Sequence, residues 1–271
     1  MRPNPLRRAE SIETGSRVKR SFSWRVLGWY KRNAAAPVYR RAVGLHLSQP
    51  LISFTFDDYP QSAIRVAGTI LKNHGVRGTY YVSLGLLDTD APAGRLCREE
   101  DVLRTADEGH EVGCHTYQHC HSWDTDAKTY ERAIERNREA IGKMIPGAGF
   151  RSFSYPIALP RPSVKRVCGR HFASSRGGGQ AFNSGVADLN QLSAFFLEKV
   201  NGDIAPVREI IERNKRANGW LIFATHDVSA QPSPYGCTPD FFSAVVEYAV
   251  KSGARILPVG NAVDLIQGKA E

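Results

Sequence analysis

The sequence lacks any apolar run that approaches the ~20 residues needed to cross a bilayer as a helix. Its N-terminus also lacks the compact apolar core of a secretory signal peptide. We therefore expect a cytoplasmic location, with peripheral contact to the inner membrane face left open. Internal repeats and low-complexity tracts are missing too. The 271 residues suffice for one large domain, and an α/β barrel of roughly 200–250 residues would fit as a single unit.

Cysteine is scarce and irregularly spaced. The five residues, Cys97, Cys114, Cys120, Cys168 and Cys237, are odd in number and include no CxxC pair. A disulfide framework is therefore not expected. We interpret them as ordinary thiols, because a free cysteine behaves as a small hydrophobic residue.

Charge is unevenly distributed along the chain. Lys and Arg number 36 and Asp and Glu number 27, of which residues 1–50 hold 11 and 2 respectively. That segment therefore carries the whole net charge of +9, and residues 51–271 are neutral. The sequence predicts a basic N-terminal extension over residues 1–50. Such an extension favours an anionic partner, which we take to be an anionic membrane surface and not a nucleic acid.

Residues 21–47 mix aromatic side chains with arginine and lysine. Two interpretations fit this stretch. A helix lying in a lipid interface would carry Phe22, Trp24, Trp29 and Tyr30 beside basic residues. A helix packed on the outside of a barrel would carry the same residues, with arginines reaching around its edge. We favour the packed helix.

Beyond residue 50, short apolar segments alternate with amphipathic ones. The apolar segments predict strands at 51–56, 78–83, 110–116, 150–156, 171–175, 220–227 and 255–259. The amphipathic segments predict helices at 61–75, 98–109, 126–145, 163–170, 205–219 and 238–253. Repeated strand–helix units imply parallel strands joined by right-handed crossovers. The pattern therefore predicts an α/β fold, either a barrel or a doubly wound sheet.

Polar residues cluster at the carboxyl ends of three of these strands. Asp57 and Asp58 follow the first strand, His115 lies at the carboxyl end of the third, and His226 and Asp227 lie at the carboxyl end of the strand at 220–227. Active sites of α/β barrels gather at this carboxyl-end rim. The placement therefore predicts one common site.

His115 and His119 are four residues apart in the stretch HTYQH. If the chain turns helically there, both imidazoles lie on one face. Together with one carboxylate they would offer two nitrogens and one oxygen, a set typical of catalytic zinc and of non-haem iron. A bound cation would also relieve the repulsion between the adjacent carboxylates of Asp57 and Asp58.

These motifs, in this order, resemble those of the metal-dependent polysaccharide deacetylases, which share the fold of the nodulation chitooligosaccharide deacetylases. The stretch TFDD is similar to the family's first motif, HTYQH to the second, and THD to the last. The resemblance runs from about residue 51 to the C-terminus, so it implies a catalytic domain over residues 51–271. It also implies a distorted, incomplete (β/α) barrel with about seven parallel strands.

The resemblance implies a role for each motif residue. Asp57 becomes the catalytic base, Asp58, His115 and His119 become metal ligands, and His226 becomes the general acid. The implied cofactor is one divalent metal ion, with zinc preferred over cobalt, nickel, manganese or iron. The implied reaction is hydrolysis of an N-acetyl or similar acyl group from an amino sugar or saccharide, that is, of a C–N bond other than a peptide bond.

The chain departs from the family pattern in three places. Tyr59 stands where the family has glycine, and we expect it to narrow the sugar groove. The third motif reads FRSFSYPIA, and aligning it on Pro156 makes a backbone N–H near Ile157 the oxyanion donor. The carboxylate that tunes the catalytic histidine has no clear match, and Asp188 is the candidate. The residues assigned to the substrate side of the site are Tyr59, Arg151, Tyr155, Ile157, Asp188 and Asp227.

Two other functions remain as alternatives. One is a non-catalytic carbohydrate-binding protein with a relict site, and the other is an iron oxygenase. Iron oxygenases usually carry their ligands on an antiparallel β fold, which this pattern does not resemble. The complete set of base, acid and ligand residues favours the deacetylase. A cytoplasmic location would suit a sugar precursor or a lipid-linked saccharide better than mature cell wall.

Overall fold

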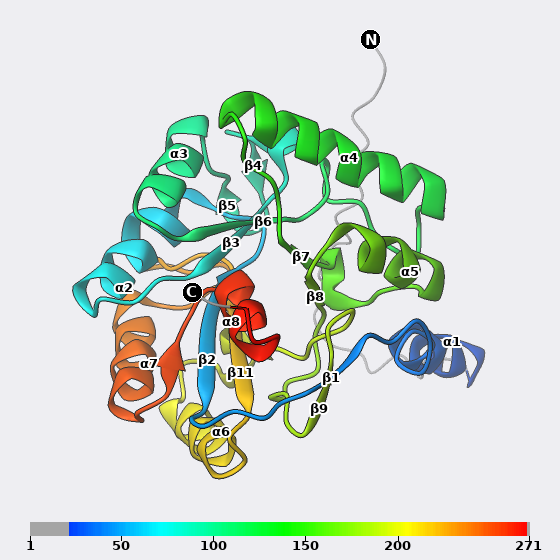
Figure 1. Ribbon diagram of the computed structural model, residues 1–271. Helices are drawn as coiled ribbons and strands as arrows, with labels where there is room; N and C mark the ends of the chain where they lie inside the picture. The colour runs from blue at the N-terminus through cyan, green and yellow to red at the C-terminus, as the bar shows by residue number, and fades with distance from the viewer. Residues whose placement is uncertain (1–21, 270–271) are drawn as a thin grey trace.

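The protein is described by a computed structural model over residues 22–269, without the side chains of residues 22–26 and 32. Its main sheet consists of parallel strands that curl into an open barrel (Figure 1). In spatial order these are β10 (Phe195–Phe196), β11 (Trp220–Thr225), β2 (Leu51–Phe56), β3 (Thr79–Val82), β6 (Glu111–Cys114), β7 (Ser152–Ser154) and β8 (Ser174–Arg176). The predicted incomplete barrel with about seven parallel strands is confirmed.

The strand β2 has neighbours on both of its edges. It pairs with β11 along its whole length, and all six of its residues are buried. On its other edge the carboxyl half pairs with β3, while the amino half pairs with the short strand β12 (Arg255–Ile256). This fork makes β2 the strand around which the barrel is built, and its complete burial fits a sheet covered on both faces.

Helices cover the outside of the barrel (Figure 1). They are α2 (Thr69–Asn73), α3 (Glu99–Asp107), α4 (Ala127–Met144), α5 (Pro162–His171), α6 (Ile204–Arg216) and α7 (Pro239–Lys251). Each of these helices falls within or beside a predicted range. The predicted helix at 61–75 is an exception in detail, because it begins as a π-helical segment at Ala63–Gly68 before α2 continues it.

A further helix, α8 (Val259–Ile266), closes the amino-terminal end of the barrel and was not predicted (Figure 1). Residues 255–259 were expected to form one strand, but pairing stops at Ile256. Buried acceptors bind the first N–H groups of α8. Thr79 Oγ1 accepts from Val259 N at 2.9 Å, and a Glu111 carboxylate oxygen accepts from Gly260 N at 2.8 Å. These acceptors cap the helix start.

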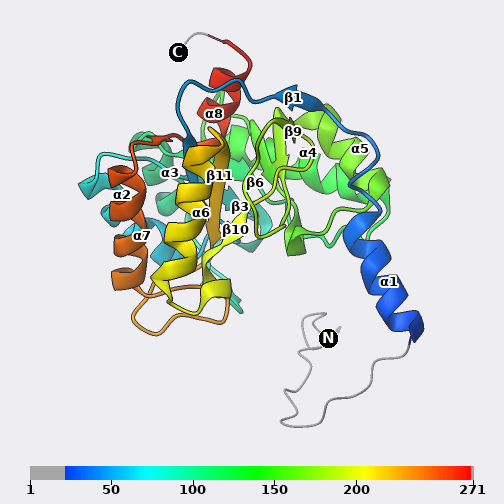
Figure 2. The same ribbon diagram turned by 90° about the horizontal axis from the view of Figure 1, so that it is seen from below.

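The N-terminal segment runs along the barrel. Helix α1 (Phe22–Asn33) lies beside α5 and extends beyond it (Figure 2). The strand β1 (Ala42–Gly44) then pairs antiparallel with β9 (Val186–Asp188). The remaining elements are the hairpin β4 (Asp90–Ala91) and β5 (Gly94–Arg95), and the 3-10 turns Leu84–Leu86, Pro156–Ala158 and Leu197–Val200. None of the described helices is both long and apolar enough to span a bilayer.

Candidate active site

The paired carboxylates lie at the carboxyl end of β2. Asp57 still belongs to the sheet through a 2.9 Å bond from its N–H to Thr225 O. The chain then turns sharply, because Asp58 and Tyr59 both have positive φ, at 56° and 53°. Aspartate tolerates this left-handed conformation better than most residues. The turn separates the two carboxylates, so that they bind different partners.

Asp58 faces the two motif histidines. Its Oδ1 lies 3.3 Å from His115 Nε2 and 3.2 Å from His119 Nε2. The His115 Nδ1 lies 2.8 Å from Ser154 O, and a carbonyl only accepts, so Nδ1 carries the proton. This leaves the Nε2 lone pair of His115 directed at the space beside Asp58. The ligand atoms of all three residues lie within 4.8 Å of one another.

The expected helical turn between the histidines is wrong. Residues 115–119 form an irregular loop in which Thr116 and His119 have positive φ, at 62° and 51°. The Thr116 hydroxyl accepts from Cys120 N at 2.8 Å and closes the loop. The loop still brings the two imidazole rings to a centroid separation of 5.0 Å. The spacing predicted the pair correctly, but through the wrong local conformation.

The electrostatics of this cluster suit a divalent cation. Burial lowers the pKa of His119 to about 4, so its imidazole is neutral at physiological pH. Burial alone would raise the pKa of Asp58, but its interactions with His115 and His119 bring it well below its ordinary value. The cluster therefore presents one carboxylate and neutral imidazole nitrogen, a donor set that suits zinc and similar ions.

Asp57 forms a buried ion pair with Arg176, the last residue of β8. The Arg176 side chain also donates to Ser154 Oγ at 2.8 Å and to Gly177 O at 3.2 Å. Burial raises the pKa of Asp57. The charge of Arg176 and the neighbouring His115 lower it by more than burial raises it, so the pKa of Asp57 lies below its ordinary value. Asp57 is therefore an ionised carboxylate held away from the Asp58 cluster.

His226 follows β11 and reaches the same rim. Its Nδ1 lies 3.1 Å from Tyr235 O, so this nitrogen carries a proton and Nε2 is free to act. His226 lies close enough to Asp57 and Asp58 to interact with both carboxyl groups. The structure thus brings together Asp57, Asp58, His115, His119 and His226, the five residues of the three sequence motifs.

Sequence reasoning missed two charged residues at this rim. Arg176 stands one position beyond the strand predicted at 171–175, and its place at a strand end was the available signal. Glu198 lies in the 3-10 turn Leu197–Val200, after a two-residue strand that no pattern indicated. Its Oε2 is buried without a hydrogen-bond partner. Burial raises the pKa of Glu198, while the charge of His226 lowers it, so the two side chains interact.

Four of the residues assigned to the substrate side lie elsewhere. Arg151 precedes β7, at the opposite end of the barrel, and pairs with Asp264 of α8. The Tyr59 side chain is fully buried, and its hydroxyl bonds to Asp101 O, so it does not narrow a groove. These two assignments are corrected: one residue precedes its strand, and the other turns inward at the positive φ.

Tyr155 and Asp188 are also corrected. Tyr155 is buried, and its hydroxyl donates to Asn190 O at 2.9 Å. Asp188 lies 2.7 Å from the buried Lys165 Nζ and receives the N–H of Arg41 at 2.9 Å. Its partners hold the N-terminal segment on the barrel, so Asp188 is not the carboxylate beside His226.

The last two assigned residues lie near the rim. Asp227 is buried and accepts from Ser233 N at 2.8 Å, so it shapes the loop that follows β11. Ile157 is exposed in the turn after β7 and has φ of 62°, a strained value for a β-branched residue. The assignment of the backbone N–H near Ile157 as the oxyanion donor stays a prediction.

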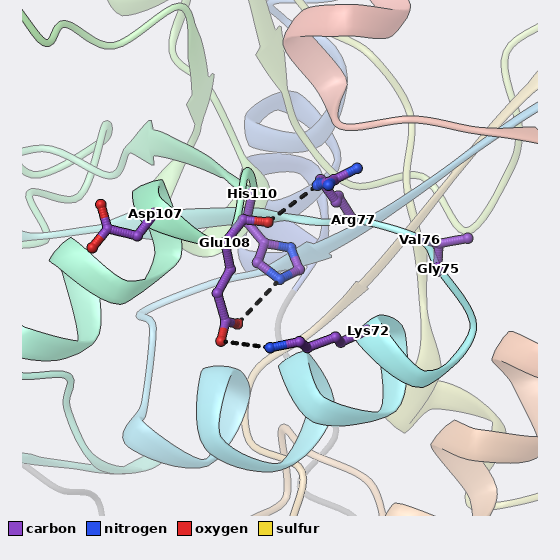
Figure 3. Close-up of a pocket in the computed structure, with 7 residues that line it drawn as sticks. All are labelled: Lys72, Gly75, Val76, Arg77, Asp107, Glu108 and His110. Carbon is purple, nitrogen blue, oxygen red and sulfur yellow. Dashed lines mark hydrogen bonds and ion pairs between the residues drawn. The ribbon is translucent and has the colours of Figure 1, made fainter.

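A separate pocket lies at the amino-terminal ends of β3 and β6 (Figure 3). Both of its basic side chains bind Glu108: Lys72 Nζ lies 3.4 Å from the carboxylate Oε1, and Arg77 Nε donates to the backbone carbonyl of Glu108 at 3.1 Å. Burial lowers the pKa of His110 to about 4, so that ring is neutral. The pocket holds none of the motif residues.

Comparisons with known proteins agree with the motifs. The family model described as polysaccharide deacetylase matches residues 45–169. A search of curated proteins found no match. Among solved structures, one described as T48 deacetylase with substrate is similar with a TM-score of 0.56 and 18% identity, over 83% of this chain and 94% of that one.

Two further structures share the fold. A family 4 acetyl xylan esterase from Clostridium thermocellum, in complex with a cobalt ion, has a TM-score of 0.56 and 18% identity, over 81% of this chain and 93% of that one. A CE4 family pseudoenzyme from Bacillus anthracis has a TM-score of 0.55 and 12% identity, over 81% of this chain and 67% of that one. At these identities the likeness establishes the fold. Over residues 45–169 the chain is similar to the polysaccharide deacetylases, and two of the three motifs, TFDD and HTYQH, lie in that range.

Proposed function

We propose that this protein is a metal-dependent hydrolase that removes an N-acetyl or similar acyl group from an amino sugar or saccharide. The observation that carries the proposal is the separation of the two adjacent carboxylates. Asp58 faces His115 and His119, and Asp57 is held by Arg176. One carboxylate is thereby available as a ligand and the other as a base.

Asp58, His115 and His119 would hold the metal ion. The fit rests on the Nε2 atoms of both histidines, which converge within 3.3 Å of one Asp58 oxygen. A divalent cation there supplies Lewis acidity toward the acyl carbonyl and lowers the pKa of water. Zinc is the preferred ion for this donor set, while cobalt, nickel, manganese and iron also accept it.

Asp57 takes the proton from the attacking water. Because Arg176 lowers the pKa of Asp57, the carboxylate is ionised at neutral pH and ready to accept. The same ion pair fixes the direction in which the carboxylate points. Ile157, in its strained turn, would offer its backbone N–H to the developing oxyanion.

His226 gives a proton to the departing amine. Its Nδ1–H is held by Tyr235 O, which leaves Nε2 as the nitrogen that exchanges the catalytic proton. Glu198 is the carboxylate that interacts with His226, in the place that the sequence had suggested for Asp188. The products are acetate, or another small acid, and a free amino sugar.

The test separates ligand from base. Asp58→Asn and His119→Ala should lose the metal, measured by elemental analysis. Asp57→Asn should keep the metal and lose about 10²–10⁴-fold in kcat for acetate release. Asp90→Asn is the matched control, because Asp90 is an exposed carboxylate whose ion-pair partner among the described residues is Arg95. Metal loss in Asp57→Asn, with activity kept in Asp58→Asn, would reverse the two roles.

The same assay addresses the alternative of a carbohydrate-binding protein with a relict site. A relict site would bind saccharide without releasing acetate at any metal concentration. Comparing N-acetyl with O-acetyl sugars then decides whether the scissile bond is C–N, as proposed, or C–O.

We also propose that the protein works in the cytoplasm at an anionic membrane surface. The support is the charge of residues 1–50, which hold the whole net charge of +9. Residues 51–271 carry no net charge to oppose it. A cytoplasmic amino-sugar precursor or lipid-linked saccharide would be the substrate there.

A further inference from the structure

Helix α1 contacts the loop that carries a metal-site histidine. The Tyr30 ring meets the Trp123 ring edge-on at a centroid distance of 5.7 Å, and Lys31 Nζ lies 5.7 Å from the same ring. Four residues earlier in that loop stands His119, whose ring lies 5.4 Å from that of His121. The end of α1 therefore lies next to the loop between the metal-site histidines and α4.

The same helix exposes large apolar side chains. Leu27, Trp29 and Tyr30 are 51%, 62% and 50% exposed, although each would gain from burial. At 3.6 residues per turn, Leu27 and Trp29 point about 200° apart around the helix. Exposed apolar side chains therefore lie on more than one side of α1. Tryptophan and tyrosine favour the interface of a bilayer, where one end of the ring is apolar and the other is wet.

The net charge of the N-terminal segment also favours a bilayer as the partner. Residues 1–50 carry the whole net charge of +9, and basic residues beside exposed apolar ones are typical of segments that bind anionic lipid. A nucleic acid would satisfy the charge but would leave Leu27 in water. An anionic bilayer satisfies both observations.

The direction of α1 decides which face of the barrel would meet the bilayer. In Figure 2, α1 runs past the barrel on the side where the loop between β11 and α7 lies, and α8 lies on the opposite side. That loop begins with His226. A membrane that holds α1 would therefore lie on the active-site side of the barrel.

We propose that α1 docks on an anionic bilayer with the active-site rim facing it, and that the acylated amino sugar is carried on a membrane lipid. This proposal rests on the deacetylase activity proposed above, and it names the class of substrate. The sugar headgroup reaches Asp57 and His226 at the rim while the lipid stays in the bilayer.

The test compares one sugar in two settings. One substrate is N-acetylglucosamine joined to a dialkyl lipid in vesicles of phosphatidylglycerol and phosphatidylcholine, and the other is a soluble N-acetylglucosamine oligosaccharide. The variant is Leu27→Ser with Trp29→Ser. The control is Val186→Ser, because Val186 is 61% exposed and lies on β9, away from α1.

We expect the double variant to sediment with these vesicles at least about tenfold more weakly and to deacetylate the lipid-held sugar about tenfold more slowly. Its rate on the soluble sugar and its metal content should equal those of the wild type, and the control should match the wild type throughout. Equal vesicle binding by wild type and double variant would overturn the docking role of α1. Docking without faster turnover of the lipid-held sugar would overturn the substrate assignment. No acetate from either sugar, with vesicle binding intact, would reject the deacetylase activity alone.

Discussion

At the scale of single residues, the buried pair of Asp57 and Arg176 decides how the carboxylate behaves. Both side chains are almost fully buried, so neither charge has water to stabilise it. Removing one partner from such a pair leaves the other charge uncompensated, which costs far more than the intact pair contributes. Arg176 is therefore a positioning residue that keeps Asp57 both ionised and correctly oriented.

Replacing Arg176 by methionine should lower the free energy of unfolding by about 3–5 kcal/mol. Without the guanidinium, burial is the dominant effect on Asp57, and its pKa rises. The acid limb of kcat should then move to higher pH, because the base is protonated earlier. Urea unfolding and a pH–rate profile at saturating metal measure the two effects. Arg151→Met, at the other end of the barrel, is the control for the rate.

The double variant Arg176→Met with Asp57→Asn separates the explanations. If the lost stability comes from an uncompensated charge, removing that charge should recover much of it. An additive loss in the double variant would show that Arg176 stabilises the barrel through packing alone, and the pH shift would then be absent.

Most of the candidate site was predictable because its residues directly follow strands. Asp57, His115 and His226 each stand at a strand end, and parallel strands bring their carboxyl ends to one rim. Glu198 could not be found this way, because it follows a two-residue strand whose sequence carries no pattern. The inward turn of Tyr59 was equally hidden, since it depends on a positive φ that no local rule required.

At the scale of elements, the loop from His226 to Cys237 acts as the support for the catalytic imidazole. Asp227 accepts from Ser233 N, and Cys237 N donates back to Asp227 O at 3.0 Å. This closed loop places the Tyr235 carbonyl against His226 Nδ1. The geometry leaves no room at Gly236, where an added Cβ would lie 2.2 Å from Asp227 Oδ1.

Gly236→Ala should therefore shift the loop and release His226 from Tyr235. We expect kcat to fall by about tenfold or more, with metal content unchanged, because a small misplacement of a catalytic group has large effects. Gly149→Ala is the control, since a Cβ there meets no atom within 4 Å. Metal-loaded enzyme should be assayed for both. Unchanged kcat in Gly236→Ala would show that the loop does not position His226.

The elements themselves were largely visible in the sequence, with two informative failures. Helix α8 was hidden because its first N–H groups are capped by Thr79 and Glu111, which are distant in sequence. The π-helical start of the segment at Ala63–Gly68 was hidden because its side-chain pattern is that of an ordinary helix. For α8, tertiary contacts decided where the helix begins.

At the scale of the whole molecule, the predicted boundary between residues 50 and 51 stays a prediction, but the segment before it is fastened to the barrel. Lys165 Nζ donates to Ala35 O at 2.8 Å, and Asn190 donates to Tyr39 O at 2.8 Å. Leu45 is buried. The packing favoured from the sequence therefore describes residues 35–45, whereas most of the described side chains of α1 are exposed.

A chain that starts at Gln49 should be less stable than one that starts at Ala34. The shorter chain loses the burial of Leu45 and leaves Asn190 and Lys165 without backbone acceptors, which together cost about 3 kcal/mol. Thermal and urea unfolding of both chains measure this difference. Equal stability would mean that residues 34–48 contact the barrel without contributing to its free energy of unfolding. Because truncation would also lower the stability of the barrel, vesicle binding is better tested by point variants in α1.

The fork of β2 has a consequence for the order in which the protein folds. Ser53 Oγ donates to Leu257 O across 204 positions, and Leu51 pairs with Arg255. The strand that anchors the barrel thus stays incomplete until nearly the whole chain has left the ribosome. Contacts of such long sequence separation slow folding and expose unpaired strand edges in the meantime. A nascent chain of this protein should therefore remain dependent on chaperones until residues 255–257 have been made and can pair with β2.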